Sequence, residues 1–255
     1  MKKIFLVFLF LVFCGCNSAH KKETIRIGID SKFYPLDFEE QQTYVYGFIQ
    51  EMLLEMAKEL SIEIEQVNAN WDVLFEGLDS SKNQMSRYDV VISSKKPHNF
   101  NQAHYHFSPI FLDTGLVLVL PKEAKETSWK ELVGKRIGSI GQYTFLQEKE
   151  GILVTFYEKF PEMCDDLIEG KIEACVIPNV FSIYYLRNLY VKDLKITSFV
   201  TKEGLQFISL NETKGKAKEL IEKGMAILEK KHILEKLKIK WGLADPSLWE
   251  ANWKD

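Results

Sequence analysis

The stretch YDVVISSKKPHNFNQAHYHFSPIFLDTGLVLVLP, residues 88–121, contains two apolar runs separated by a polar connection. The first run, at 88–93, and the second, at 114–121, have the length and apolar character of buried β-strands. Strands that are apolar on both faces belong to sheets that helices cover on both sides. The stretch therefore predicts an α/β fold, in which the flanking segments supply the helices.

Strand and helix patterns alternate on both sides of this stretch. Apolar residues recur at helical spacing at 47–60, and Ser128 and Glu131 have the spacing of a capping box at the start of another helix. The expected strands are 24–30, 61–67, 88–93, 114–121, 135–140, 152–157, 171–177, 194–200 and 204–210, and the expected helices are 47–60, 71–78, 144–150, 161–170, 179–189, 214–230 and 233–241. Two such series, joined by strands near 115–121 and 196–206, predict two α/β lobes with parallel sheets and two crossings.

Composition and missing motifs narrow the range of functions. The 33 Lys and Arg residues are nearly balanced by 36 Asp and Glu residues, so the chain lacks the basic character of nucleic-acid-binding proteins. The sequence contains no Gly-rich phosphate-binding loop with dinucleotide or P-loop spacing, and no CxxC, HExxH or GxSxG motif. It therefore favours a binding protein without a cofactor over an enzyme.

Residues 1–15 have the pattern of a secretion signal. Two lysines precede ten apolar residues at 4–13, a run too short to span a bilayer. Gly15 and Cys16 are similar to a bacterial lipobox, in which the cysteine is acylated, although Phe13 stands where leucine is usual. We expect a lipid anchor at Cys16, a polar tether at 16–23 and an extracytoplasmic, periplasmic-side location. An uncleaved membrane anchor is the alternative.

Two cysteines, Cys164 and Cys175, remain in the body of the chain. They could form a disulfide in an oxidising compartment. Both lie at apolar positions of their elements, which favours two buried free thiols.

The order of several segments resembles that of one protein family. The segments are IRIGIDSKFYPLDFEE (25–40), YGFIQEMLLEMAKEL (46–60), YDVVISS (88–94), HFSPIFLDTGLVLVLPK (106–122) and LIEGKIEACVIPN (167–179). Together they resemble the bacterial extracellular solute-binding proteins of family 3, which serve polar-amino-acid ABC importers. The resemblance implies a type II periplasmic-binding-protein fold, with a two-stranded hinge and a ligand cleft between lobes at 24–116 plus 204–255 and at 117–203.

The resemblance also suggests which residues contact the ligand. Asp30 stands at the position of a ligand-contacting aspartate, and Phe33 and Trp71 stand where the family places aromatic walls, Trp71 as in glutamine binders. Asp30 could instead cap a turn, and the two aromatic residues could pack in the core. Further candidates follow the strand ends, where open α/β sheets bind ligands: Ser93, Ser94, Gln142, Tyr143, Thr144 and Asn179.

Two family positions differ in this chain. The arginine that clamps a ligand carboxylate is replaced by Asn101, and the aspartate that binds the ligand ammonium is replaced by Pro178, with Asn179 next. An unpaired ligand charge in a closed cleft is costly. We therefore expect Lys96 to bind the carboxylate in place of arginine, and Asn179 or Asp30 to bind the ammonium. Alternatively, Lys95 and Lys96 both face solvent.

Three histidines, His98, His104 and His106, fall within the polar connection. A zinc site needs three or four converging ligands. No cysteine or acidic residue is near them in sequence, so we expect no metal site and a solvated or ligand-rim role.

The sequence thus predicts a lipid-anchored substrate-binding protein of an ABC importer. Its partners would be a small polar ligand, the membrane subunits of the importer and the membrane itself. The expected ligand is a polar, glutamine-like amino acid or a related small metabolite. The alternatives are an enzyme on the same fold, similar to cyclohexadienyl dehydratase, and a ligand-sensing receptor.

Overall fold

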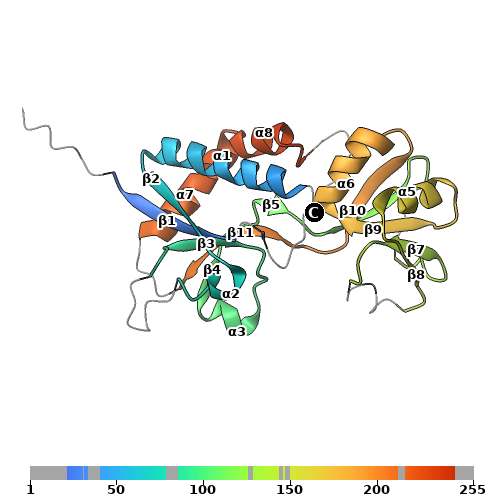
Figure 1. Cartoon of the computed structure of the whole chain (residues 1–255), viewed down its shortest axis with the longest axis horizontal. Helices are drawn as coiled ribbons and strands as arrows, with labels where there is room; N and C mark the ends of the chain where they lie inside the picture. Colours follow the sequence, from blue (N-terminus) through green and yellow to red (C-terminus); the bar gives the residue numbers. More distant parts are fainter. Residues whose placement is uncertain are drawn as a thin grey trace, which may run out of the picture.

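The computed structural model describes residues 22–30, 32–33, 41–78, 86–125, 129–143, 146, 150–211 and 216–244. Its strands form two separate sheets, which lie in the left and right halves of Figure 1. We call the half built on the first sheet lobe 1 and the half built on the second sheet lobe 2.

The sheet of lobe 1 has the strand order β2-β1-β3-β11-β4, and β5 also pairs with β11. Its strands are β1 (Thr24–Ile29), β2 (Glu63–Asn68), β3 (Val90–Ser93), β4 (Tyr105–Phe107), β5 (Leu112–Asp113) and β11 (Gly204–Leu210). The first three are parallel, and β11 is antiparallel to β3, β4 and β5. Because β11 comes from the far end of the chain, lobe 1 is built from both ends of the described sequence.

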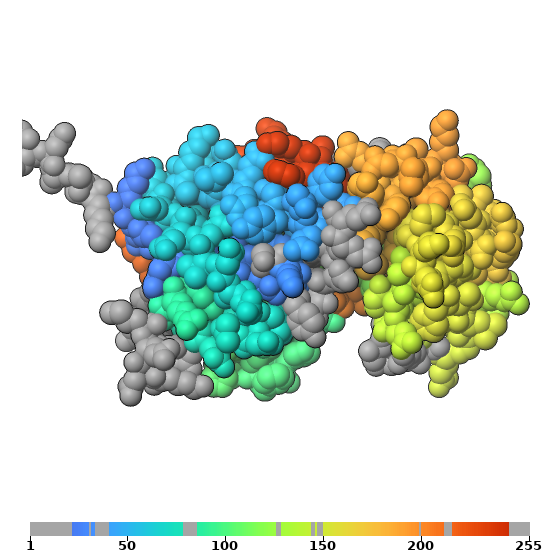
Figure 2. Space-filling model, in the orientation of Figure 1, coloured from blue at the N-terminus to red at the C-terminus, as the bar shows by residue number. Residues whose placement is uncertain are grey.

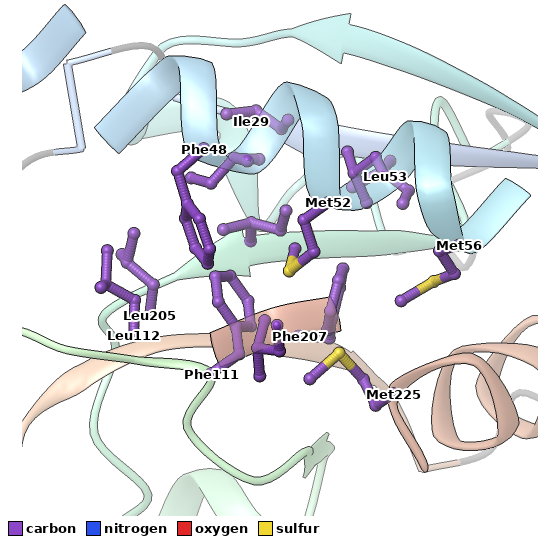
Figure 3. Close-up of a cluster of buried hydrophobic side chains, with 14 of the residues drawn as sticks. Ile29, Phe48, Met52, Leu53, Met56, Phe111, Leu112, Leu205, Phe207 and Met225 are labelled. Atoms are coloured by element: carbon purple, nitrogen blue, oxygen red, sulfur yellow. The ribbon is translucent and has the colours of Figure 1, made fainter. Parts of the chain in front are cut away.

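Helices α1 (Gln42–Leu60), α7 (Lys216–Lys230) and α8 (Ile233–Lys240) contribute to the core over one face of this sheet. The buried side of α1 repeats at helical spacing through Phe48, Met52 and Met56, which Figure 3 shows pointing toward the sheet. Phe111 lies between Phe48 and Phe207, with ring centroids 6.3 and 5.1 Å away. On the other face, a smaller core includes residues of the short helix α2 (Trp71–Leu74).

The sheet of lobe 2 has the order β10-β6-β9-β7-β8. Its strands are β6 (Leu116–Pro121), β7 (Arg136–Ser139), β8 (Leu153–Phe156), β9 (Ala174–Pro178) and β10 (Leu194–Phe199). Alternate residues of β6 belong to two different buried clusters, so this sheet is covered on both faces, as the apolar run predicts. The helices described in this lobe include α5 (Phe160–Ile168), α6 (Asn179–Tyr185) and the π-helical η2 (Leu186–Tyr190).

Two chain segments, at 113–116 and 199–204, cross between the lobes and lie against each other. Thr201 Oγ1 accepts a hydrogen bond of 2.9 Å from Leu116 N, and Glu203 O accepts one of 2.9 Å from Thr114 N. Gly115 faces the backbone of Thr201 so closely that a Cβ atom would overlap its carbonyl oxygen. The crossings therefore form one hydrogen-bonded pair rather than two independent linkers.

Several sequence expectations are wrong in detail. Residues 129–134 form turns, so the capping-box helix expected from Ser128, itself outside the described residues, does not continue there. Most of the helix expected at 144–150 also lies outside the described residues. Neither sheet is purely parallel, since β11 runs antiparallel in lobe 1 and β6 does so in lobe 2. The short elements α3 (Asn99–Gln102), β4 and β5 were not expected.

Cys164 and Cys175 are free and buried, which confirms the expectation of two thiols. Burial raises the pKa of Cys164 to about 12 and raises the pKa of Cys175 well above its ordinary value. Both thiols are therefore protonated at neutral pH and contribute as apolar core residues. Among the described residues, no helix is both long enough and apolar enough to cross a membrane.

Candidate ligand-binding site

The candidate residues follow strands of both lobes. The carboxyl ends of β1 and β3 share one edge of the first sheet because these strands are parallel, and the ends of β7 and β9 share one edge of the second sheet for the same reason. Figure 2 shows a notch between the two halves at the lower edge of the view. Candidates from two sheets can therefore contact one ligand only if the ligand lies between the lobes.

Asp30 and Phe33 shape the turn after β1. Asp30 is 7% exposed, and its Oδ1 accepts a hydrogen bond of 3.0 Å from Lys32 N, so the carboxylate does cap a turn. Phe33 is 3% exposed, has a left-handed φ of 55° and packs in the core of lobe 1. Both residues thus have structural roles in this conformation, and their contact with a ligand stays a prediction.

An aromatic group surrounds Trp71, the first residue of α2. Its ring lies edge-on to Phe75 at 5.9 Å, and Phe75 lies at 5.4 Å from Tyr105. Lys95 places its Nζ 4.3 Å from the centre of the Phe75 ring, a cation–π contact. Trp71 is half-buried in this group, so part of its indole remains available to a ligand. Phe75 and Tyr105 were not among the predicted site residues, and the helical spacing of Trp71 and Phe75 is the signal that could have linked these two side chains.

Lys96 carries an ion pair that the sequence did not predict. Its Nζ lies 2.6 Å from Oε1 of Glu203, which belongs to the second crossing segment, 107 positions away in the chain. The Lys96 side chain is 51% exposed and that of Glu203 is 24% exposed. The cation therefore lies beside the crossing with its charge already compensated by a carboxylate.

The loop that follows Lys96 is closed by Asn101. Asn101 is 3% exposed; its Oδ1 accepts a hydrogen bond of 2.6 Å from His98 N, and its Nδ2 donates one of 2.9 Å to Lys96 O. The oxygen and the nitrogen of the Asn101 amide thus both bind backbone groups of the loop. In the family, the arginine at this position would instead extend toward the ligand. Ser93 is also engaged locally, since its Oγ accepts a hydrogen bond of 3.2 Å from Lys95 N. Ser94 is half-buried beside it.

In lobe 2, the segment after β7 is shaped by Ser139, whose Oγ donates a hydrogen bond of 2.7 Å to Gly141 O. Gln142 is exposed and Tyr143 is half-buried against an apolar cluster. Thr144 lies outside the described residues. Gln142 and Tyr143 therefore follow this hydrogen-bonded turn, and of the two Gln142 has the more accessible side chain.

Asn179 lies where lobe 2 meets the crossing. It is 4% exposed, its backbone N donates to Gly115 O at 2.9 Å and its Nδ2 donates to Asp113 O at 3.1 Å. Within the described part of the chain, its Oδ1 is buried without a hydrogen-bond partner. An unsatisfied buried acceptor costs about 1–3 kcal/mol, so this oxygen is a natural position for a donor from a ligand.

The three histidines occupy separate environments. His98 stacks on Phe100 at 5.9 Å, His104 is exposed, and His106 places Nε2 at 2.9 Å from Glu222 of α7 without hydrogen-bond geometry. Among the residues that the structure describes, no group of three His, Cys, Asp or Glu side chains is placed to hold a metal ion.

Residues 25–244 match the family of bacterial extracellular solute-binding proteins, family 3. The chain belongs to this family. Its curated relatives include the L-cystine-binding protein TcyJ of Escherichia coli K12, 24% identical over 90% of this chain and 86% of the relative, and the L-cystine-binding protein TcyA of Bacillus subtilis, 21% identical over 88% and 83%. The family and these relatives are solute-binding proteins rather than enzymes.

Solved structures agree on the fold. The L-cystine solute receptor of Neisseria gonorrhoeae, in its unliganded open conformation, has a TM-score of 0.67 and 18% identity, covering 89% of this chain and 95% of the receptor. The substrate-binding protein of a polar amino acid ABC uptake transporter from Streptococcus thermophilus has a TM-score of 0.65 and 19% identity, covering 88% and 89%. The predicted type II periplasmic-binding-protein fold is thereby confirmed.

Proposed function

We propose that this protein captures a polar amino acid outside the cytoplasm and delivers it to the membrane subunits of an ABC importer, without altering it chemically. The observation that carries the proposal is the family match at 25–244, because it spans both lobes and both crossings. The ligands in the names of the relatives agree with an amino-acid ligand, since they include L-cystine and histidine. Binding in such a clamp comes from desolvation between the lobes together with a few polar contacts.

The proposed clamp consists of lobe 1 at 24–116 and 204–255, lobe 2 at 117–203, and the paired crossings as its hinge. Lobe 1 would contribute Asp30, Phe33, Trp71, Ser93, Ser94, Lys96 and Asn101, and lobe 2 would contribute Gln142, Tyr143, Thr144 and Asn179. Trp71 already lies on an accessible aromatic surface, whereas Phe33 and Asn101 would have to rearrange, because their side chains are buried in local packing.

The ion pair between Lys96 and Glu203 supports a zwitterionic ligand. A ligand carboxylate at Lys96 competes with Glu203, and a ligand ammonium at Glu203 compensates for that competition. This pair supplies both signs of charge that the family arginine and aspartate normally supply, although Asn101 and Pro178 occupy those two positions. L-glutamine, which the sequence predicts, and L-cystine, which two relatives bind, are therefore the first ligands to test.

The test is a ligand screen on the mature protein, stripped of copurified ligand by reversible denaturation. Each common L-amino acid and L-cystine is added while the melting temperature is followed, and each positive result is checked by titration calorimetry. A ligand at 100 times its dissociation constant stabilises the folded state by about 2.7 kcal/mol, a clear shift in melting temperature. The proposal fails if no amino acid shifts the melting temperature and mass spectrometry of the copurified material finds none.

We also propose a lipid anchor at Cys16, which lies outside the described residues. The support is the basic and apolar leader followed by Gly15-Cys16. In the expressing bacterium, the wild-type protein should partition into the detergent phase of a Triton X-114 extraction, and Cys16→Ser should move to the aqueous phase. Equal partitioning of the two proteins would contradict lipidation.

A further inference from the structure

A cavity of about 330 Å³ lies where lobe 2 meets the helices that close lobe 1. Its lining comes from the crossing at Leu112 and Asp113, from Asn179 and Ile183 of α6, and from the α7–α8 region. Figure 1 shows β5, α6 and α8 converging in this part of the molecule. Its volume is at the lower end of the range of about 300–1,000 Å³ that is usual for ligand pockets. Of the predicted ligand contacts, Asn179 alone lines it among the described residues.

The charged lining of this cavity is dominated by carboxylates. Asp113, Glu229 and Glu235 face one ammonium, that of Lys238, which gives a net formal charge of −2 with His232 neutral. Glu229 and Glu235 are exposed, whereas Asp113 is partly buried on the crossing. Burial raises the pKa of the Asp113 carboxyl, which indicates that Lys238 compensates its charge only in part. The cavity thus has a partly buried negative charge that a cation would stabilise.

A second observation points to the same occupant. The buried Oδ1 of Asn179 accepts no hydrogen bond within the described part of the chain, and Nδ2 of the same amide binds the backbone of Asp113. Asn179 and Asp113 both line this cavity, so an amide and a carboxylate are present there as hydrogen-bond acceptors. Acceptors of this kind suit an ammonium group, which offers three donors and no acceptor.

Apart from His232, the rest of the described wall is apolar. Leu112, Ile183, Leu234, Leu243 and Ala244 supply it. Such a surface suits an aliphatic chain, while the acceptors hold the charged end. We propose that this cavity is a second binding site, which shares Asn179 with the proposed cleft between the strand ends, and that it takes a small primary alkylammonium ion.

Occupancy of this site would connect the two lobes. Its lining joins Asn179 and Ile183 of lobe 2 to α8 of lobe 1 across the crossing. A cation held there would contact both halves of the clamp, so its binding would be linked to lobe closure to the extent that closure changes the spacing between Asn179 and α8.

The test is calorimetric titration of the full mature protein, free of amino acids, with n-butylammonium chloride, and with 1-butanol as the neutral analogue. Asp113 and Lys238 are not among the proposed cleft contacts, so variants at these two positions report on this cavity independently of the proposed amino-acid function. We expect binding in the millimolar range or tighter for the ammonium, and affinity at least tenfold lower for the alcohol. Equal affinity of the two compounds, or no binding of either up to 50 mM, would overturn the proposal.

Two variants with opposite expected effects separate a charge effect from unfolding. Asp113→Asn removes the partly buried carboxylate and should weaken n-butylammonium binding about tenfold or more. Lys238→Met removes the competing cation and should strengthen it severalfold. Lys236→Met, on the exposed side of α8 and outside the cavity lining, is the matched control and should bind as wild type does. Melting curves verify that each variant is folded, and weakening by Lys238→Met in a folded protein would contradict the assigned charge pattern.

Discussion

Gly115→Ala tests whether the two crossings depend on close backbone contact. A Cβ atom at this position would overlap Thr201 O, lie 3.0 Å from the Thr201 carbonyl carbon and lie 3.2 Å from Glu203 N. Carbon–oxygen contacts are usually no shorter than about 3.3 Å, so the segments must separate by about 1 Å. The obstacle is backbone on both sides, and a change of side-chain rotamer cannot relieve it.

The cost follows from the bonds that hold the crossings together. Hydrogen bonds of 2.9 Å (Leu116 N to Thr201 Oγ1), 2.7 Å (Val200 N to Leu116 O) and 2.9 Å (Thr114 N to Glu203 O) join the segments. A separation of about 1 Å stretches them beyond ordinary hydrogen-bond length. Losing two or three at about 0.5–1.5 kcal/mol each predicts destabilisation of about 1–4.5 kcal/mol.

The measurement is the free energy of unfolding in urea, followed by circular dichroism, with the m-value checked for a change in unfolding behaviour. The control is Gly170→Asn, because Gly170 has φ of 73° and an added Cβ would meet no neighbouring atom. Asparagine enters the left-handed region readily, so the control should lose less than about 1 kcal/mol. A loss below about 0.5 kcal/mol for Gly115→Ala, with an unchanged m-value, would refute the close-contact account of the hinge.

Three further predictions concern the clamp and its stability. Trp71→Ala should weaken ligand binding by about 1–3 kcal/mol, and an unchanged dissociation constant would make Trp71 purely structural. Lys96→Met should weaken it tenfold or more, about 1.4 kcal/mol, while Glu203→Gln should weaken a zwitterion but not a simple carboxylate, as titration calorimetry can distinguish. Glu51 accepts hydrogen bonds from Lys240 Nζ and Trp241 Nε1, which lower the pKa of its carboxyl. The stabilisation that the ionised Glu51 carboxylate gives to the folded state is fully present above its unfolded-state pKa of about 4.3, and it is lost as the pH falls through its lower folded-state pKa. Glu51→Gln should therefore reduce the melting temperature more at pH 7 than at pH 3. Equal reductions at both pH values would contradict this assignment.

The fold could be predicted from the sequence because its elements have clear local patterns. The two apolar runs correspond to β3 and β6, and the helical repeat at 47–60 corresponds to most of α1. Strand direction was predicted less well, because a buried strand has the same apolar sequence pattern whether its neighbour is parallel or antiparallel. β4 and β5 have three and two residues, which is too short for a periodic signal.

The candidate site was harder to predict because its contacts join distant parts of the chain. The partner of Lys96 is 107 positions away and the hydrogen bond from Asn179 spans 66 positions, so no local pattern indicated Glu203 or Asp113. At Asn101, the sequence shows that the family arginine is replaced, but it does not show that the amide closes the loop. A short amide can close its own loop by satisfying two backbone groups, which an arginine at the same position would leave free.

These contacts also narrow the chemistry of the proposed ligand. The cations of the polar connection are already engaged, Lys95 by the ring of Phe75 and Lys96 by Glu203. A simple carboxylate that displaced Glu203 from Lys96 would leave a partly buried carboxylate unpaired beside the ligand, which is costly. A zwitterion avoids this cost because its ammonium takes the place of Lys96 at Glu203. The arrangement therefore favours an amino acid over a monoanionic organic acid.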